Sequence, residues 1–236
     1  MNTQINLQSF TMRSGGGIFS NFVGEDSLYI NISRSIVIIM TPKQVEKIKK
    51  KIDAIKAALA ADKKQWGGDY HDGRGLRYLP PQYYIQLGDF KGGLRYFNWF
   101  NKNFPDDAGF PHFLFEWTIV LFKTGKLKEA QTKLFQTYTE NTYLFDKFLG
   151  KPIVPIEKWE GSNLNKPEFA TEYFSYFCKQ EGLESFAGWL ETTISTEPFP
   201  ALCARFIEIF QRLNTEKDYD IRRALVDEAN QLEKQL

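Results

Sequence analysis

The sequence has little of what most catalytic sites need. Only two histidines and two cysteines occur among its 236 residues, so metal binding or catalysis based on these side chains has few candidates. Cys178 and Cys203 form no CxxC pair, which favours two reduced thiols, with one disulfide as the alternative. A P-loop, a GxSxG turn, a GxGxxG fingerprint and an HExxH motif are also missing. We therefore expect a protein that is not an enzyme and has no cofactor or metal.

Net charge is small as well. Thirty Lys and Arg residues against 29 Asp and Glu give a formal charge of +1, whereas phosphate binding depends on accumulated positive charge. Residues 41–66 alone carry eight lysines against three acidic residues, and could contact nucleic acid or an acidic surface. Their regular apolar stripe instead indicates that the lysines are the solvated side of a packed helix. No nucleic-acid partner is expected.

Long apolar runs are missing too. The longest aliphatic run, Ile36–Met40, has five residues, whereas a membrane-spanning helix needs about 20. Residues 1–10 carry no positive charge ahead of an apolar stretch, unlike a secretory signal peptide. We therefore expect a protein that does not bind a membrane and resides in the cytoplasm.

What is present divides the chain at residue 40. Residues 1–40 hold a Ser-Gly-Gly-Gly breaker and then β-branched residues, typical of a short hairpin. Disorder, or a start codon assigned too far upstream of Met40, is the alternative. From Thr41 a capping box and apolar residues at helical spacing predict a helix ending near Ala61. The sequence thus predicts an N-terminal extension over 1–40 and a helical domain over 41–236.

The fold class predicted for the body is all-α. Glycines and prolines break the chain at 66–81, and a connection at 151–167 is too irregular for a helix. Elsewhere the apolar periodicity is helical. Helices are expected at 82–87, 89–103, 111–123, 126–140, 141–149, 168–180, 183–195, 199–213 and 217–236.

A pattern of glycines, small residues and large apolar residues repeats within residues 75–145. Gly88 and Gly125 are each followed by an apolar residue at +2, a small one at +5 and a large apolar one at +9. Glycine permits a tight turn between antiparallel helices, and the small residue lets those helices approach closely. The pattern resembles the tetratricopeptide repeat, although Gly93 stands where that family usually has Ala and the second copy lacks a closing proline. The matching positions are Gly88, Phe90, Gly93, Phe97, Phe100, Pro105, Trp117, Gly125, Leu127, Ala130 and Leu134.

This resemblance implies helical hairpins stacked in a short solenoid, with the first helix of each unit facing a concave groove that binds a protein or peptide. Chaperone-binding members clamp a carboxylate there with Lys and Asn. Tyr78, Gln82 and Glu116 occupy those places here, so a more apolar ligand is implied. We predict a non-catalytic binding scaffold and assign it no oligomeric state. Its groove residues would be Tyr78, Gln82, Ile85, His112, Phe115, Glu116, Ile119 and Lys123.

Two loops carry the alternative hypothesis, an enzyme or small-ligand-binding protein using residues 69–75 and 151–167. In the first, His71 lies between Asp69 and Asp72, a set of metal-ligand types whose spacing matches no known framework and is also typical of a polar turn. In the second, glutamate, lysine and asparagine beside Trp159 could support acid–base chemistry. A self-associating structural module is a third hypothesis.

Overall fold

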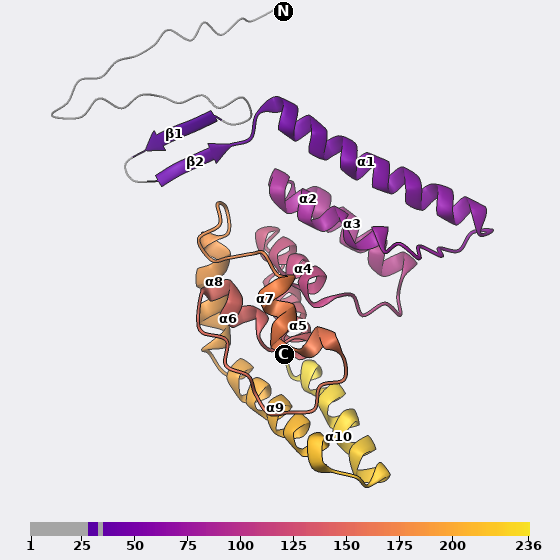
Figure 1. Ribbon diagram of the computed structural model, residues 1–236, viewed down its shortest axis with the longest axis vertical. Coiled ribbons are helices and arrows are strands. Elements are labelled where there is room, and N and C mark those ends of the chain that lie inside the picture. Colours follow the sequence, from indigo (N-terminus) through magenta and orange to yellow (C-terminus); the bar gives the residue numbers. More distant parts are fainter. Residues whose placement is uncertain (1–27, 33–34) are drawn as a thin grey trace, which may run out of the picture. The chain divides into compact units, whose positions relative to one another are not determined.

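The computed structural model describes residues 28–32 and 35–236, with side chains described from residue 40 onward (Figure 1). The chain divides into two units, Met1–Gln44 and Val45–Leu236. In the first, β1 (Leu28–Ile32) and β2 (Ser35–Ile39) form an antiparallel hairpin, with Leu28 opposite Ile39. The remaining residues of the expected extension, including the Ser-Gly-Gly-Gly segment, lie outside the described residues.

Helix α1 (Pro42–Gln65) starts where the capping box predicted and continues four residues beyond Ala61. The Gln44 side-chain oxygen accepts from the Thr41 amide at 2.7 Å, and the Thr41 hydroxyl accepts from the Gln44 amide at 3.3 Å. Ile48, Ile52 and Leu59 form the buried stripe, and the lysines between residues 43 and 56 are exposed. The lysine-rich segment is therefore the solvated side of an amphipathic helix.

The second unit is helical between its loops, and most bounds lie within two residues of the predicted ones. Its elements after α1 are η1 (Leu76–Tyr78), α2 (Pro80–Leu87), α3 (Phe90–Asn103), α4 (Pro111–Lys123), α5 (Leu127–Glu140), α6 (Leu144–Leu149), η2 (Asn163–Asn165), α7 (Pro167–Glu172), α8 (Glu184–Ile194), α9 (Phe199–Thr215), α10 (Tyr219–Leu232) and η3 (Glu233–Gln235). Among the described residues, no helix is both long enough and apolar enough to cross a lipid bilayer.

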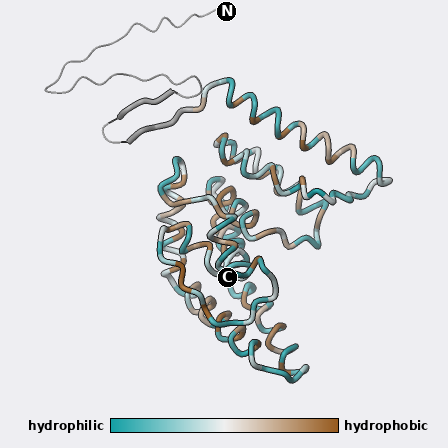
Figure 2. The backbone as a smooth tube through the Cα atoms, in the orientation of Figure 1, coloured by the Kyte–Doolittle hydropathy of each residue, from teal (hydrophilic) through white to brown (hydrophobic). Residues whose placement is uncertain are grey.

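Helix α4 is the centre of this unit. Nine of its 13 residues are buried, because α2, α3, α5 and α8 all pack against it. The tube in Figure 2 shows apolar residues recurring along these central helices, with polar residues between them. A helix that is apolar on most sides must be enclosed, and the helices around it supply that enclosure.

The glycine at the +5 position of the first repeat copy marks a close contact between helices. A Cβ atom added at Gly93 would lie 3.1 Å from Val120 Cγ2 of α4 and 3.4 Å from Tyr84 Cβ of α2. The first separation is shorter than an ordinary contact and the second is at the lower limit of one, so a small residue at this position permits close packing of α3 against its neighbours.

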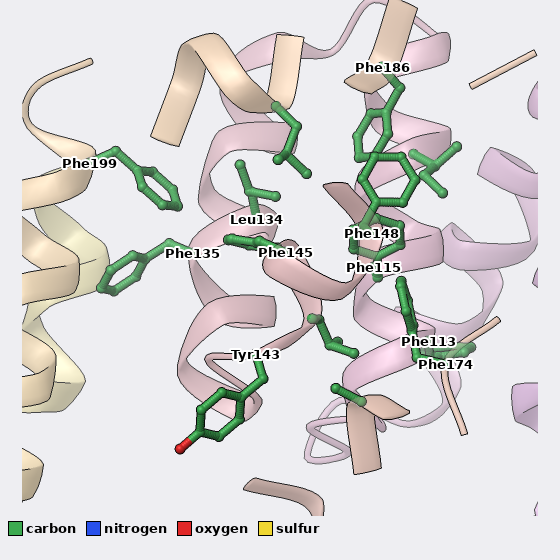
Figure 3. Packing of buried hydrophobic residues seen from close by; sticks show 14 of the residues in the cluster. Phe113, Phe115, Leu134, Phe135, Tyr143, Phe145, Phe148, Phe174, Phe186 and Phe199 are labelled. Atoms are coloured by element: carbon green, nitrogen blue, oxygen red, sulfur yellow. The ribbon is translucent and has the colours of Figure 1, made fainter. Parts of the chain in front are cut away.

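An aromatic segment from later in the chain covers α4 on its remaining side. The Phe115 ring centroid lies 4.9 Å from that of Phe174 and 5.4 Å from that of Phe186. Phe148 of α6 completes the cluster at 5.0 Å, and Figure 3 shows these rings gathered with Phe113 close by. We call residues 173–190 the covering segment. It packs against core residues such as Phe115, which lie about sixty positions earlier in the sequence.

The covering segment corrects one predicted helix. A single helix was expected over 168–180, but α7 ends at Glu172 and the chain then runs as a loop to α8. The Cys178 amide donates to the Phe148 carbonyl at 2.8 Å, so this backbone group bonds to the end of α6 instead of to its own turn. Burial of Phe174 thus outweighs the local helical periodicity.

Gly93→Leu should destabilise the fold, because a branched side chain has no space between Tyr84 and Val120. Overpacking of this kind costs about 1–3 kcal/mol in the free energy of unfolding, which urea denaturation followed by circular dichroism measures. Gly188→Ala on α8 is the matched control, since nothing lies within 4 Å of its added Cβ. That variant should be more stable by about 0.5–1 kcal/mol through helix propensity. Equal stabilities for Gly93→Leu and the wild type would contradict close packing at this site.

Candidate functional site

The structure separates the eight expected groove residues into two groups. Phe115 and Ile119 have no exposed surface, and Ile85 is 7% exposed. The covering segment lies over α4 and contacts Phe115. All three side chains belong to the hydrophobic core and do not line an open groove. Lys123 is tied to the same cover, because its Nζ donates to the Ser185 hydroxyl at 2.8 Å.

The other four expected residues come together around one small cavity. Tyr78, Gln82, His112 and Glu116 line a space of about 160 Å³, which Leu79 and residues 173–176 complete. The loop side is fixed by the Tyr176 hydroxyl, which donates to Glu116 Oε1 at 2.7 Å. We call this cavity the Glu116 pocket. It brings together residues that the repeat resemblance placed on one face of two successive helices.

Two titratable side chains in the Glu116 pocket have shifted pKa values. Glu116 is 3% exposed, and its burial raises the pKa of the carboxyl to about 8, against the opposing effect of the Tyr176 hydrogen bond. His112 stacks between the rings of Phe110 and Phe169, and burial lowers its pKa. Burial thus favours the uncharged form of both groups.

Each of these two side chains also carries a buried polar atom with no protein partner within the described chain: Glu116 Oε2 and His112 Nδ1. The two residues are four positions apart on α4, so they lie on the same face of the helix. A buried polar atom without a partner costs about 1–3 kcal/mol. Both atoms are buried from solvent, so they are polar groups that the packing around α4 leaves unsatisfied.

The loop at 69–75, which the alternative hypothesis proposed as a site, is held by two carboxylates that bind its backbone, Asp62 from α1 and Asp72 from the loop itself. Asp62 accepts from the amides of His71 and Asp72, and Asp72 accepts from those of Leu76 and Arg77. Within the described residues no group of three His, Cys, Asp or Glu side chains is arranged to hold a metal ion. The polar-turn interpretation of the Asp69–Asp72 sequence is the one that the contacts support.

Arg77 connects this loop to the turn before α4. Its Nη1 lies 3.0 Å from Asp72 Oδ2, and its Nε lies 2.7 Å from Asp107 Oδ2. Tyr78 donates to the same Asp107 carboxylate. Burial alone would raise the pKa of Asp107, but the hydrogen bonds from Tyr78 and Arg77 outweigh it and lower the pKa. These charges are paired with one another beside the Glu116 pocket.

A longer and more open groove follows the outer side of α5. Two cavities of about 430 and 410 Å³ share Thr139, Glu140, Asn230 and Glu233, so they are neighbours, and we call the pair the α5 groove. One cavity is walled by α5, α9, α10, η3 and the connection around Trp159, and the other by α5, α10, η3, the turn at 105–108 and residues of α3 and α4. The repeat resemblance did not indicate this groove, because α9 and α10 lie outside residues 75–145. Trp159, in the irregular connection, was the one signal that pointed to it.

The α5 groove has an aromatic floor and an acidic rim. Phe135, Phe206, Phe210, Trp159 and Trp117 contribute rings, and the carboxylates come from Asp106, Asp107, Glu140 and Glu233, with Lys133 as the one lysine in the lining. Asp107 is already paired with Arg77, and Glu233 accepts from Gln136, which leaves Asp106 and Glu140 as the carboxylates without such a partner among the described residues. Glu140 lies where the two cavities join, and burial raises the pKa of its carboxyl. Lys133 lies 4.1 Å above the Trp117 ring, and burial lowers its pKa to about 8. The groove is therefore suited to a cation that brings apolar groups with it.

Comparison with known protein families, with curated protein sequences and with solved structures finds no match to this chain.

Glu116→Gln should change how stability depends on pH. The pKa of Glu116 is raised from 4.5 to about 8 on folding, so between these values the native state holds a proton that the unfolded chain releases. Stability of the wild type should therefore fall as pH rises through this window, by up to about 1 kcal/mol per pH unit. The glutamine keeps an acceptor for Tyr176 and does not titrate, so this loss should disappear.

Urea denaturation of both proteins across the pH window measures the effect. Glu191→Gln, which changes an exposed residue of α8, is the matched control and should follow the wild type. Parallel curves for Glu116→Gln and the wild type would show that Glu116 is ionised in the native state.

Proposed function

We propose that the protein is a non-catalytic module that binds a basic peptide segment of a partner protein in the α5 groove. The observation that carries this proposal is that two cavities, of about 430 and 410 Å³, lie next to each other and share four lining residues. A single compact ligand needs one concave site, whereas an elongated depression over several helices suits an extended chain. The partner is therefore a peptide segment and not a small metabolite.

Charge selects the kind of peptide. Glu140 has no side-chain hydrogen bond or ion pair with another described residue, although it is half-buried at the junction of the two cavities. A desolvated carboxylate of this kind gains most from a cation that enters beside it. Lysine or arginine side chains of the partner would ion-pair with Glu140 and pack on the neighbouring aromatic rings.

The groove walls are already fixed without a ligand. The Trp159 amide donates to the Phe210 carbonyl at 2.8 Å, and the Asn165 side chain donates to the Glu140 carbonyl at 2.7 Å. Asn141 holds the same connection through the carbonyls of Leu164 and Lys166. Little ordering entropy remains to be lost on binding, which favours affinity for an extended segment.

The helical hairpins support a tetratricopeptide-like scaffold for this module. Hairpin α2–α3 is followed directly by α4–α5, and α4 packs against both helices of the first hairpin, as in a solenoid of stacked repeats. In this proposal the face of α4 expected to bind the partner is occupied by the covering segment. Binding is then assigned to the α5 side, and a cytoplasmic location is proposed with it.

Fluorescence anisotropy with labelled ten-residue peptides tests the proposal. A peptide of alternating arginine and leucine should bind the wild type more tightly than its glutamate–leucine counterpart, and added salt should weaken the binding. Glu140→Gln should weaken it about tenfold, the equivalent of about 1.4 kcal/mol. The glutamine leaves the Glu140 carbonyl, and hence its bond to Asn165, in place.

Two further variants distinguish binding in the groove from general electrostatic attraction to the protein. Glu191→Gln removes a carboxylate on α8 outside the groove and should leave affinity unchanged. Trp159→Ala removes an aromatic wall and should weaken binding of the arginine–leucine peptide. If basic and acidic peptides bound equally, or if Glu140→Gln and Glu191→Gln behaved alike, the α5 groove would not be the binding site.

A further inference from the structure

A further cavity lies between α1, the loop that follows it, α2 and α3. It measures about 320 Å³ and shares no lining residue with the α5 groove or the Glu116 pocket. Its whole lining belongs to the unit Val45–Leu236. Ligand pockets in proteins typically measure about 300–1,000 Å³, so this cavity can enclose a small molecule. We call it the Tyr84 pocket, and its lining includes Lys56, Tyr70, Tyr84, Gly92, Arg95 and Trp99.

Aromatic rings form much of the wall of the Tyr84 pocket. Tyr84 and Tyr96 are buried, and their ring centroids lie 6.1 Å apart. The Trp99 ring lies 5.1 Å from that of Tyr96 and 5.6 Å from that of Tyr70, so the four rings make one connected surface. Such a surface suits a flat aromatic group, because rings attract one another in offset-stacked and edge-on arrangements.

Gly92 contributes to the wall without a side chain. A Cβ atom added there would lie 2.7 Å from Cε1 of Tyr84 and would overlap the Asp89 carboxylate, which accepts from the Gly92 amide at 2.8 Å. A glycine inside a helix is unfavourable, and the close approach of α3 to Val120 explains only the neighbouring Gly93. Gly92 instead leaves the Tyr84 ring in the position where it lines the pocket.

Two cationic side chains line the same pocket. Lys56 and Arg95 are exposed to solvent, and Lys56 Nζ lies 5.4 Å from the centroid of the Tyr84 ring. Neither cation forms an ion pair with another residue in the described part of the chain. The lining residues that the structure describes also include no Asp or Glu. The pocket therefore combines aromatic wall with positive charge that no ion pair neutralises.

We propose that the Tyr84 pocket binds a small planar aromatic molecule that carries a negatively charged group. The ring lies against the aromatic wall, and the charged group ion-pairs with Arg95 and Lys56. A guanidinium binds a carboxylate or a phosphate through two parallel hydrogen bonds, and an ammonium adds a second positive charge. A cavity of about 150 Å³ holds benzene, so about 320 Å³ has room for two fused rings.

The probe is 2-naphthoate, measured on the full chain by isothermal titration calorimetry. The matched ligands are 2-naphthamide, which has the same rings without the charge, and acetate, which has the carboxylate without the rings. We expect 2-naphthoate to bind with one-to-one stoichiometry and each matched ligand to bind at least about tenfold more weakly. Added salt should weaken the binding of 2-naphthoate only. Equal affinity for 2-naphthoate and either matched ligand, or no binding of 2-naphthoate at millimolar concentration, would overturn the proposal.

Charge variants show whether the two cations bind the anionic group. Arg95→Gln should weaken 2-naphthoate binding about tenfold, and Lys56→Gln should weaken it by a smaller factor because an ammonium lacks the two-pronged geometry. Both residues are exposed, so the fold should tolerate either change. Lys102→Gln on α3 and Lys47→Gln on α1 are matched controls that remove exposed charges outside the pocket. If the controls weakened binding as much as Arg95→Gln, attraction to the pocket would be non-specific and the proposal would be wrong.

A ring variant tests the aromatic wall separately. Trp99 is half-buried, and Trp99→Leu keeps an apolar side chain but removes the ring. This variant should weaken 2-naphthoate and 2-naphthamide by similar factors, because both ligands share the rings, whereas Arg95→Gln should weaken only the charged ligand. Circular dichroism shows whether each variant is folded. Unchanged 2-naphthoate affinity in folded Trp99→Leu would contradict binding against this wall, and the two charge variants test the site independently of it.

Discussion

The enclosure of α4 is the constraint on which the rest of the structure depends. This helix is apolar on nearly every side, so neighbouring helices alone leave one face open, and the covering segment is needed to close it. Phe115 shows how α4 is enclosed, since its ring contacts aromatic residues from α6, from the loop at 173–176 and from α8. Both candidate sites follow from this arrangement: the Glu116 pocket lies under the cover, and the α5 groove lies on the side that the cover leaves free.

A polar residue in that enclosed helix explains the unusual chemistry of the smaller site. Glu116 is surrounded as completely as the phenylalanines beside it, yet Tyr176 satisfies only one of its oxygens. Burial without a cation favours the protonated carboxyl over the carboxylate. The α5 groove differs in its number of carboxylates, and burial also raises the pKa of Glu140 there, so that group would gain from a cation that enters beside it. One chain therefore offers a small buried pocket and an acidic groove as separate cavities.

Local sequence patterns predicted the helices well and the sites poorly. The bounds of α4 match the prediction because its periodicity and Pro111 are local signals, and the capping box of α1 did the same for residue 42. The helix expected over 168–180 was wrong, because the Cys178 amide bonds to Phe148, a contact across 30 positions that periodicity cannot register. Phe115 and Ile119 were expected in an open groove because local patterns do not register contacts between residues far apart in the sequence. The sequence of α4 does not reveal that residues 173–190 will lie over it, nor that α10 will form a wall beside α5.

The distance in sequence between contacting residues bears on which part of the protein unfolds first. Hairpin α4–α5 joins residues close in sequence, so its loop-closure cost is low, whereas the covering segment reaches back about sixty positions to Phe115. Amides near Cys178 are held by few backbone bonds, and such regions exchange their hydrogens through partial unfolding before the global transition. We expect the segment from Tyr173 to α8 to detach as one cooperative unit while the hairpins stay folded. The surface that family resemblance assigned to a partner would then exist for a small fraction of the time, held closed by the protein's own chain.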